Sequence, residues 1–349
     1  MTDPTSESTP SAAPKKRRRW PWLVAALLLV LVLAGAGTAW IARQHYIQPG
    51  PLAADATLVV ERGSGVQAIA RQLESAGIVR RHWELLIAAR LRESARRLRA
   101  GEYAFPAGIS LKGALDILES GKTVVRRLTI PEGLTSAQIV ELLRAETALS
   151  GEIAEVPPDG TLLPETYHFS YGDNRAELLG RMETGMRELL AQAWEKRAPD
   201  LPVATAEQAV TLASIVEKET GVAAERPKVA AVFVNRLRLG MRLQSDPTVI
   251  YALTEGKGPL DRPLTRADWK LEHPYNTYFI AGLPPGPIAN PGAESIRAVL
   301  NPDNHEYLYF VADGSGGHAF AETLEEHNRN VAAWRRFQRE QGQPAEEVE

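Results

Sequence analysis

A run of twenty residues without a charged side chain, Trp22–Ile41, constrains this chain more than any other feature. A helix of about that length is needed to cross the ~30 Å hydrocarbon core of a bilayer. Tryptophans stand at both ends of the run, where amphipathic rings prefer the membrane interface. Five consecutive basic residues, Lys15–Arg19, precede it, and such a cluster stays on the cytoplasmic side. The pattern predicts a basic cytoplasmic tail (residues 1–19), a single membrane-spanning helix (residues 20–42) and an extracytoplasmic remainder.

Two other interpretations of this segment remain open. Leu23–Leu33 could be the apolar core of a signal peptide, because Ala34-Gly35-Ala36 resembles a cleavage site that would leave a mature protein beginning near Gly37. The apolar run continues past that site, which favours the uncleaved anchor. A buried core helix is the other alternative, and twenty uncharged residues directly after five bases argue against it.

The charge of the remaining chain argues against nucleic acid as the main partner. The sequence has 40 basic and 43 acidic residues, and its first 19 residues hold five of the basic and two of the acidic ones. The rest therefore carries 35 basic and 41 acidic residues, a net charge of −6, which does not favour a polyanion. The absence of cysteine excludes disulfides, thiolate catalysis, zinc–cysteine sites and lipoprotein acylation.

A degenerate repeat fills residues 56–150, after a linker at residues 43–55. Each copy has a strand-like segment, a glycine turn and a short helix with an apolar stripe. The copies are Thr57–Leu73, Tyr103–Leu118 and Leu128–Leu143. The first copy also resembles a LysM motif, and LysM modules bind chains that contain N-acetylglucosamine. Any small α+β module would show the same rhythm, so the pattern alone leaves both interpretations open.

Residues 151–340 are predicted to form one mixed α+β domain, followed by a disordered tail at residues 341–349. The fold class is therefore α+β, with an N-terminal transmembrane helix, a LysM-like module and this larger domain. Within the larger domain, Thr205–Gln208 fits a capping box that opens a helix. That helix contains the most informative residues of the chain.

Two glutamates lie near the end of this helix. An apolar stripe at i, i+3, i+4 and i+7 faces the core, and Glu217 and Glu219 fall on its opposite flanks. Gly221 is expected to end the helix. Partial burial and the negative end of the helix dipole both raise a carboxyl pKa, which suits a general acid. The alternative is a solvated helix end, with either glutamate paired to Lys218 or Arg226. Periodicity alone does not choose between the two glutamates.

The segment Leu212–Thr220 resembles the signature of the YceG-like family, the MltG-type endolytic murein transglycosylases. It also resembles the shorter Ile-x-x-Gln-Glu-Ser signature of soluble lytic transglycosylases, with Thr220 in place of serine. This resemblance implies that Glu219 is the catalytic glutamate and that Glu217 is not. It extends from about residue 57 to 337, through further blocks in family order. These blocks are Val232–Leu237, Gly240–Tyr251, Tyr275–Tyr278, Gly282–Ile288 and Tyr307–Asp313.

Several residues in and near these blocks are candidates for binding substrate. Asp246 is predicted to cap the helix that follows it, and a cap can still line a site. Asn276 and Tyr278 lie in a strand-like segment and could offer amide contacts and a stacking ring. Asn235 and its neighbour Arg236 are either ordinary exposed residues or face the cleft. The candidate substrate-binding residues are Glu165, Glu217, Asn235, Gln244, Asp246, Asn276 and Tyr278.

The resemblance implies endolytic cleavage of the β-1,4 bond between N-acetylmuramic acid and N-acetylglucosamine, on nascent strands near peptidoglycan synthases of the inner membrane. Glu219 would protonate the leaving oxygen and then take the proton of the muramoyl 6-hydroxyl, giving a 1,6-anhydro end. Two rivals remain open: a lysozyme-like hydrolase using Glu165, Glu217 or Asp246 as second carboxylate, and a non-catalytic wall-binding tether. No second histidine lies at metal-ligand spacing from His318, so no metal and no other cofactor is expected.

Overall fold

The computed structural model describes residues 20–94 and 96–341. The predicted tail at 1–19 and nearly all of that at 341–349 lie outside the described residues. The chain forms two compact units, residues 1–123 and 124–349. The division therefore falls before the third copy of the predicted repeat, whereas the sequence placed it after residue 150.

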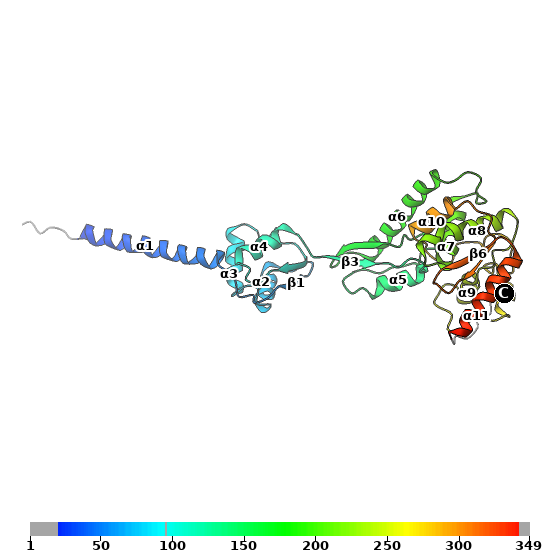
Figure 1. Cartoon of the computed structure of the whole chain (residues 1–349). Coiled ribbons are helices and arrows are strands. Elements are labelled where there is room, and N and C mark those ends of the chain that lie inside the picture. The colour runs from blue at the N-terminus through cyan, green and yellow to red at the C-terminus, as the bar shows by residue number, and fades with distance from the viewer. Residues whose placement is uncertain (1–19, 95, 342–349) are drawn as a thin grey trace, which may run out of the picture. The chain divides into compact units, whose positions relative to one another are not determined.

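The first unit begins with the long helix α1 (Trp20–Ile47), drawn in blue in Figure 1. Among the described residues it is the one helix long and apolar enough to cross a membrane, and the apolar window is unburied. It continues beyond the predicted end at residue 42, so the expected linker shrinks to the residues after Ile47. The other elements of the unit are β1 (Ala56–Val60), α2 (Val66–Ser75), α3 (His82–Leu91), β2 (Gly101–Phe105) and α4 (Leu111–Ser120).

Two of the three predicted strand–turn–helix copies are confirmed in this unit. β1 and β2 pair antiparallel, with Ala56 opposite Phe105 and Val60 opposite Gly101. The apolar stripes of α2 and α4 are buried beneath them, as the spacing predicts. The sequence analysis did not predict α3, which lies between the two copies. The core of the unit gathers Ile69, Leu73, Ile78, Leu85, Tyr103, Phe105, Leu115 and Leu118.

The second unit opens with the third copy of the repeat. β3 (Val125–Thr129) pairs antiparallel with β4 (Thr166–Ser170). α5 (Ser136–Ala145) starts at a complete capping box between Thr135 and Gln138. Its apolar face packs with β4 and with the start of α6 (Arg175–Glu195). The buried residues of this cluster include Ile130, Ile139, Val140, Leu143, Tyr167, Phe169, Leu178 and Met182.

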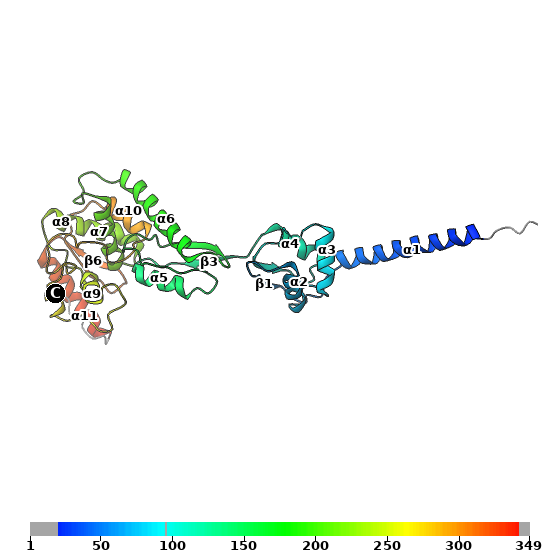
Figure 2. The same ribbon diagram turned by 180° about the vertical axis from the view of Figure 1, so that it is seen from behind.

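The main core of the second unit surrounds α7 (Ala206–Glu219), whose residues from Ala209 to Val216 are all buried. α8 (Arg226–Arg238) and α10 (Ala293–Leu300) pack against it and lie beside it in both views (Figures 1 and 2). The remaining elements are α9 (Asp246–Thr254), the hairpin of β5 (Tyr309–Ala312) and β6 (His318–Ala321), α11 (Leu324–Glu340), and the 3-10 turns Ala223–Glu225 and Asp268–Lys270. Two-stranded antiparallel sheets among helices confirm the mixed α+β class.

The strand expected at Tyr275–Tyr278 is absent: the segment forms consecutive turns. Asn276 explains the difference. Its side-chain oxygen accepts a hydrogen bond from the Tyr278 amide at 2.9 Å, and its own carbonyl accepts from the amides of Phe279 and Ile280. Such local side-chain bonds hold a backbone in a turn rather than in a ladder.

Candidate active site

The catalytic helix predicted from the sequence is α7, and its N-terminus holds half of the expected capping box. The Thr205 hydroxyl accepts from the Gln208 amide, whereas the Gln208 side chain accepts from Ala204 instead of Thr205. The helix stops at Glu219, because Thr220 turns to an extended conformation with φ −137°. The stop therefore precedes the expected glycine at position 221. This early stop places Glu219 in the last turn, at the edge of the core.

Glu219 is part-buried and accepts a hydrogen bond on Oε1 from the Ser245 hydroxyl at 2.5 Å. Burial raises the pKa of its carboxyl to about 7, and the nearby charge of Asp246 acts in the same direction. The Ser245 bond and the positive charge of Arg236 oppose that rise. A carboxyl with a pKa near neutral can both give and take a proton at physiological pH. The geometry thus supports the general-acid reading of Glu219.

Ser245 is a further candidate site residue, which the sequence analysis did not propose. It is 1% exposed, and its amide donates to the Thr277 hydroxyl at 2.9 Å. Its carbonyl accepts from the Thr248 hydroxyl at 2.6 Å, and the two threonine hydroxyls are 2.9 Å apart. These buried bonds fix the serine hydroxyl against Glu219. Two signals in the sequence could have found it: its place in the block Gly240–Tyr251 and its position directly before the Asp246-Pro247 pair.

Asp246 does not cap α9. It is the first residue of the helix, and the cap position belongs to Ser245, which makes no side-chain capping bond. Asp246 Oδ1 instead accepts from the Trp269 indole at 2.9 Å and the Tyr278 hydroxyl at 2.7 Å. The centroids of the Trp269 and Tyr278 rings are 5.9 Å apart. The capping prediction was wrong because the Trp269 and Tyr278 donors, and not a backbone amide of α9, bind the Asp246 carboxylate. The negative charge of Asp246 therefore acts on Glu219.

Two candidate residues support loops with their amides. Asn235 donates to the carbonyls of His305 and Tyr307, at 2.8 and 3.2 Å. Asn276 is fully buried and donates to the carbonyls of Trp269 and Leu271. Both therefore shape the walls around the site through backbone contacts.

Arg236, which the sequence could not assign to solvent or cleft, is buried in the second unit. It donates to the carbonyls of Leu308 at 2.6 Å and Leu243 at 2.8 Å. Its guanidinium carbon lies 5.2 Å from the centroid of the Tyr309 ring. Burial lowers the pKa of its guanidinium, and the neighbouring charge of Glu219 offsets only part of that effect. Arg236 thus supplies a fixed positive charge near Glu219.

Glu217 has a different environment. Its side chain is 6% exposed, and Oε1 contacts Arg226 Nη2 at 3.2 Å. Oε2 accepts from the Gly292 amide at 3.0 Å and from the Ser295 hydroxyl at 2.7 Å. The pairing with Arg226, which the sequence left open as part of a solvated helix end, is present for this glutamate, but the carboxylate is buried and both of its oxygens are occupied.

The remaining candidates are exposed. Glu165 precedes β4 and its carbonyl accepts from the Ile130 amide, but none of its described contacts joins it to Glu219. Gln244 has φ +50°, and its amide donates to the Thr277 carbonyl. Gln244 therefore lies next to Ser245 with its side chain accessible. Within residues 20–94 and 96–341, no group of three or more His, Cys, Asp or Glu side chains could hold a metal ion.

Comparisons with known proteins identify the family. The model of the YceG-like family matches residues 58–333. An endolytic murein transglycosylase of Bacillus subtilis is 32% identical over 301 residues, covering 77% of this chain and 82% of the relative. One of Streptococcus pneumoniae is 30% identical over 325 residues, covering 79% of this chain and 58% of the relative.

A solved structure of a yceG-like protein from Listeria monocytogenes shares 30% identity, with a TM-score of 0.48. The match covers 79% of this chain and 98% of that one. The family model alone spans well over half of the sequence. The chain belongs to the YceG-like family.

Proposed function

We propose that this protein is a lytic transglycosylase that cleaves peptidoglycan glycan strands, with Glu219 as its catalytic group. The observation that carries the proposal is the Glu219 carboxyl, part-buried, hydrogen-bonded to Ser245 and with a pKa raised to about 7. The names of the relatives, endolytic murein transglycosylases, give the substrate class and the reaction.

The reaction needs one group that first donates and then accepts a proton. Protonated Glu219 donates to the glycosidic oxygen, and the bond from that oxygen to the muramoyl anomeric carbon breaks. The substrate's acetamido group stabilises the intermediate. Glu219, now a carboxylate, takes the proton of the muramoyl 6-hydroxyl. The oxygen of that hydroxyl bonds to the anomeric carbon at the same time. The product is a 1,6-anhydro end, and no water is consumed.

The surroundings of the other carboxyl groups support this single-acid scheme. Glu217 is engaged by Arg226, Gly292 and Ser295, and Glu165 has no described contact with the site. Asp246 is the one of the three rivals whose charge acts on Glu219. A hydrolase would need a second carboxyl at about 5–5.5 or 6.5–9.5 Å from the first. A lysozyme-like reaction with Asp246 is therefore the second candidate.

Accessibility supports an assignment of the substrate contacts. Gln244 is exposed, and Asp246 and Tyr278 are part-exposed beside Glu219 and Ser245. We assign these three to glycan binding, with the Tyr278 ring as a stacking surface. Asn235, Asn276 and Glu217 are supporting residues in this scheme, because their polar atoms bind the protein itself.

Helix α1 supports a membrane location for the enzyme. Its length and its apolar composition support a single-pass anchor, and the Lys15–Arg19 cluster favours an N-terminus in the cytoplasm. The second unit then faces the cell wall. The LysM-like first unit would bind the strand, and synthases that make nascent strands in the same membrane would be partners.

Product analysis tests the reaction. Purified glycan strands are digested with the full-length protein, and the fragments are measured by mass spectrometry. A transglycosylase yields anhydro ends, lighter by one water than the reducing ends that hydrolysis yields. Retention on peptidoglycan without any fragment would support the tether and overturn the proposal.

A further inference from the structure

An apolar stripe on α3 is exposed. Trp83, Ile87 and Leu91 are 45%, 52% and 82% exposed, and they recur every four residues on one face. The opposite face, with Leu85 and Ala89, is buried in the core of the first unit. Single exposed apolar side chains need no explanation, but three in a row along one helix indicate a surface that meets another apolar phase.

Exposed arginines flank the stripe along the chain. Arg90 falls on the same face at 100° per residue, and Arg80 and Arg81 stand at the start of the helix. All three are exposed, as are Arg96, Arg97 and Arg99 after the helix. Glu84 and Glu93 are the acidic residues in this stretch. Arginines around an apolar helix face are typical of a helix that lies on an anionic lipid surface.

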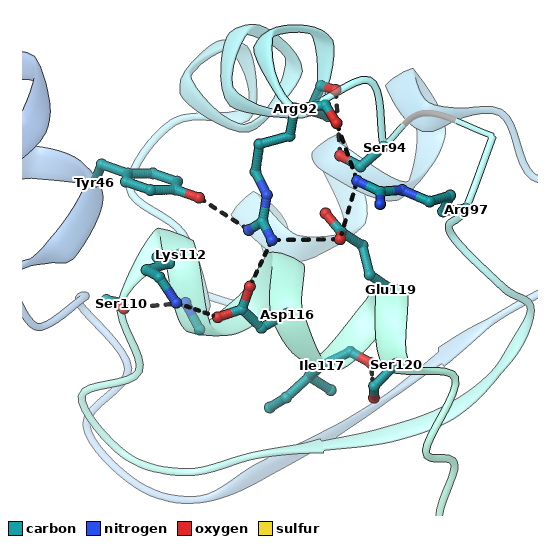
Figure 3. A network of polar contacts seen from close by, with 12 residues as sticks. Tyr46, Arg92, Ser94, Arg97, Ser110, Lys112, Asp116, Ile117, Glu119 and Ser120 are labelled. Atoms are coloured by element: carbon teal, nitrogen blue, oxygen red, sulfur yellow. Dashed lines mark hydrogen bonds and ion pairs between the residues drawn. The ribbon is translucent and has the colours of Figure 1, made fainter.

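The end of α3 is bound directly to α1. Arg92, which follows the last residue of α3, donates to the Tyr46 hydroxyl of α1 at 2.9 Å (Figure 3). Arg92 also contacts Asp116 at 2.8 Å and Glu119 at 3.3 Å, both on α4. Figure 3 shows Tyr46 reaching from α1 toward this cluster. The contact fixes the height of α3 along α1.

That height coincides with the membrane surface. Tyr46 comes five residues after Ile41, the last residue of the apolar run, which is about 7.5 Å of helix. The headgroup layer on each side of the hydrocarbon core is about 5–7.5 Å thick, from total and core thicknesses of about 40–45 and 30 Å. If α1 spans the bilayer, the end of α3 therefore lies at the outer headgroups.

The joint between α1 and the rest of the first unit is held at further points. Tyr46 and Leu52 pack on the core of the unit. The Gly50 amide donates to the carbonyls of Gly108 and Ile109, and a Cβ at Gly50 would lie 2.2 Å from the Ile109 oxygen. Within this unit, α3 lies at the end nearest α1 and runs across its direction in both views (Figures 1 and 2). A helix so placed lies along the membrane plane.

We propose that the exposed face of α3 rests in the outer interface of the bilayer, with Trp83, Ile87 and Leu91 against the acyl boundary and Arg81 and Arg90 against anionic lipid phosphates. The proposal rests on the membrane anchor of the proposed function. It makes the first unit membrane-bound at two points, through a transmembrane helix and through an interfacial one.

Single cysteine labels can test this arrangement, because the chain has no cysteine of its own. Ile87→Cys puts an environment-sensitive fluorophore on the stripe. Glu61→Cys is the matched control, because Glu61 is exposed but lies at the other end of the two-stranded sheet from α1. It follows Val60, which pairs with Gly101, whereas the end of the sheet at Phe105 leads to Gly108, which binds Gly50 after α1. The labelled full-length proteins are reconstituted in phosphatidylglycerol-containing vesicles with nitroxide-bearing lipids.

We expect blue-shifted, strongly quenched emission at position 87 and aqueous, weakly quenched emission at position 61. Adding Arg81→Ser and Arg90→Ser, or replacing phosphatidylglycerol by phosphatidylcholine, should reduce the quenching at position 87. Equal, weak quenching at both positions would overturn the proposal and leave the stripe as a surface for a protein partner. Alkaline extraction distinguishes failure of the membrane anchor from failure of the α3 proposal. Release of the chain from the vesicles would mean that α1 does not span the membrane. An embedded chain whose label at position 87 stays in water would mean that α1 spans the membrane but α3 does not contact it.

Discussion

Glu217 and Glu219 lie two positions apart on one helix, yet their partners give them different chemistry. Glu217 is held by Arg226 and by hydrogen-bond donors 75 and 78 positions later in the chain. The part-buried Glu219 carboxyl accepts a hydrogen bond from Ser245, and burial raises its pKa. Periodicity predicted both on the flanks of the core stripe, but it carries no information about donors so distant in sequence. The family resemblance supplied the choice that the pattern could not.

The raised pKa of Glu219 predicts a pH dependence of both activity and stability. The acid must be protonated in the free enzyme, so kcat/KM should fall as pH rises through about 7. Its folded pKa lies above the unfolded value, so the carboxyl destabilises the fold increasingly between about pH 4.5 and 7. Glu219→Gln removes this cost, which is on the order of 3 kcal/mol above pH 7.

Melting curves of the wild type and Glu219→Gln at pH 4 and pH 8 check the stability part. We expect a higher melting temperature for the variant at pH 8 and little difference at pH 4. The same difference at both pH values would mean that packing, and not ionisation, separates the two proteins.

Ser245 and Asp246 should move the pH profile in opposite directions. Ser245→Ala removes a hydrogen bond that favours the carboxylate, so the alkaline limb should move to higher pH, with a loss of about tenfold or more in kcat. Asp246→Asn removes a negative charge but keeps an acceptor for Trp269 and Tyr278, so the limb should move to lower pH. Rate profiles of the two variants decide this. Shifts of the same sign would contradict the described electrostatics of Glu219.

At the scale of elements, local signals predicted the helices and longer-range contacts decided the rest. The apolar stripes of α2, α4, α5 and α7 are buried as their spacing indicated. The sequence of residues 275–278 is strand-like, but the side-chain oxygen of Asn276 accepts from the Tyr278 amide and holds the segment in a turn. Likewise, Asp246 does not cap α9 as predicted, because its carboxylate accepts hydrogen bonds from the Trp269 indole and the Tyr278 hydroxyl.

Arg226 joins α8 to α7 and to the turn between β3 and α5. It contacts Glu217 at 3.2 Å and Glu132 at 2.9 Å. Arg226→Ala should cost about 3 kcal/mol, because it leaves the 6%-exposed Glu217 without its cation. Glu132→Gln should cost less than about 1 kcal/mol, since Glu132 is 38% exposed. Denaturant unfolding of both variants measures the difference, and equal losses would contradict a buried pair.

For the whole molecule, the boundary between the units decides which fragments can fold. The sequence placed the larger domain at residues 151–340, but β3 and α5 lie before residue 151 and belong to the second unit. β3 pairs with β4, and Ile139 and Leu143 of α5 are fully buried. Equivalent strand–turn–helix patterns in all three repeats concealed this division, because a repeat does not reveal which copies share a core.

A chain of residues 124–349 should therefore fold, whereas residues 151–349 should not. The shorter fragment loses the partner strand of β4 and uncovers the apolar cluster that contains Phe169 and Met182. Circular dichroism and cooperative melting distinguish the two fragments. Cooperative melting of residues 151–349 would show that the third repeat is dispensable for the second unit.

The central claim is that Glu219 alone supplies the proton transfers. Its most direct test is the rate of anhydro-fragment release from purified glycan strands by the wild type, Glu219→Gln and Glu217→Gln, each compared per folded molecule. Loss of a general acid that is also the base should reduce turnover by about 10²–10⁴-fold. We predict that loss for Glu219→Gln, with normal folding, and substantial activity with a lowered melting temperature for Glu217→Gln. Near-complete loss in folded Glu217→Gln together with retained turnover in Glu219→Gln would contradict the account.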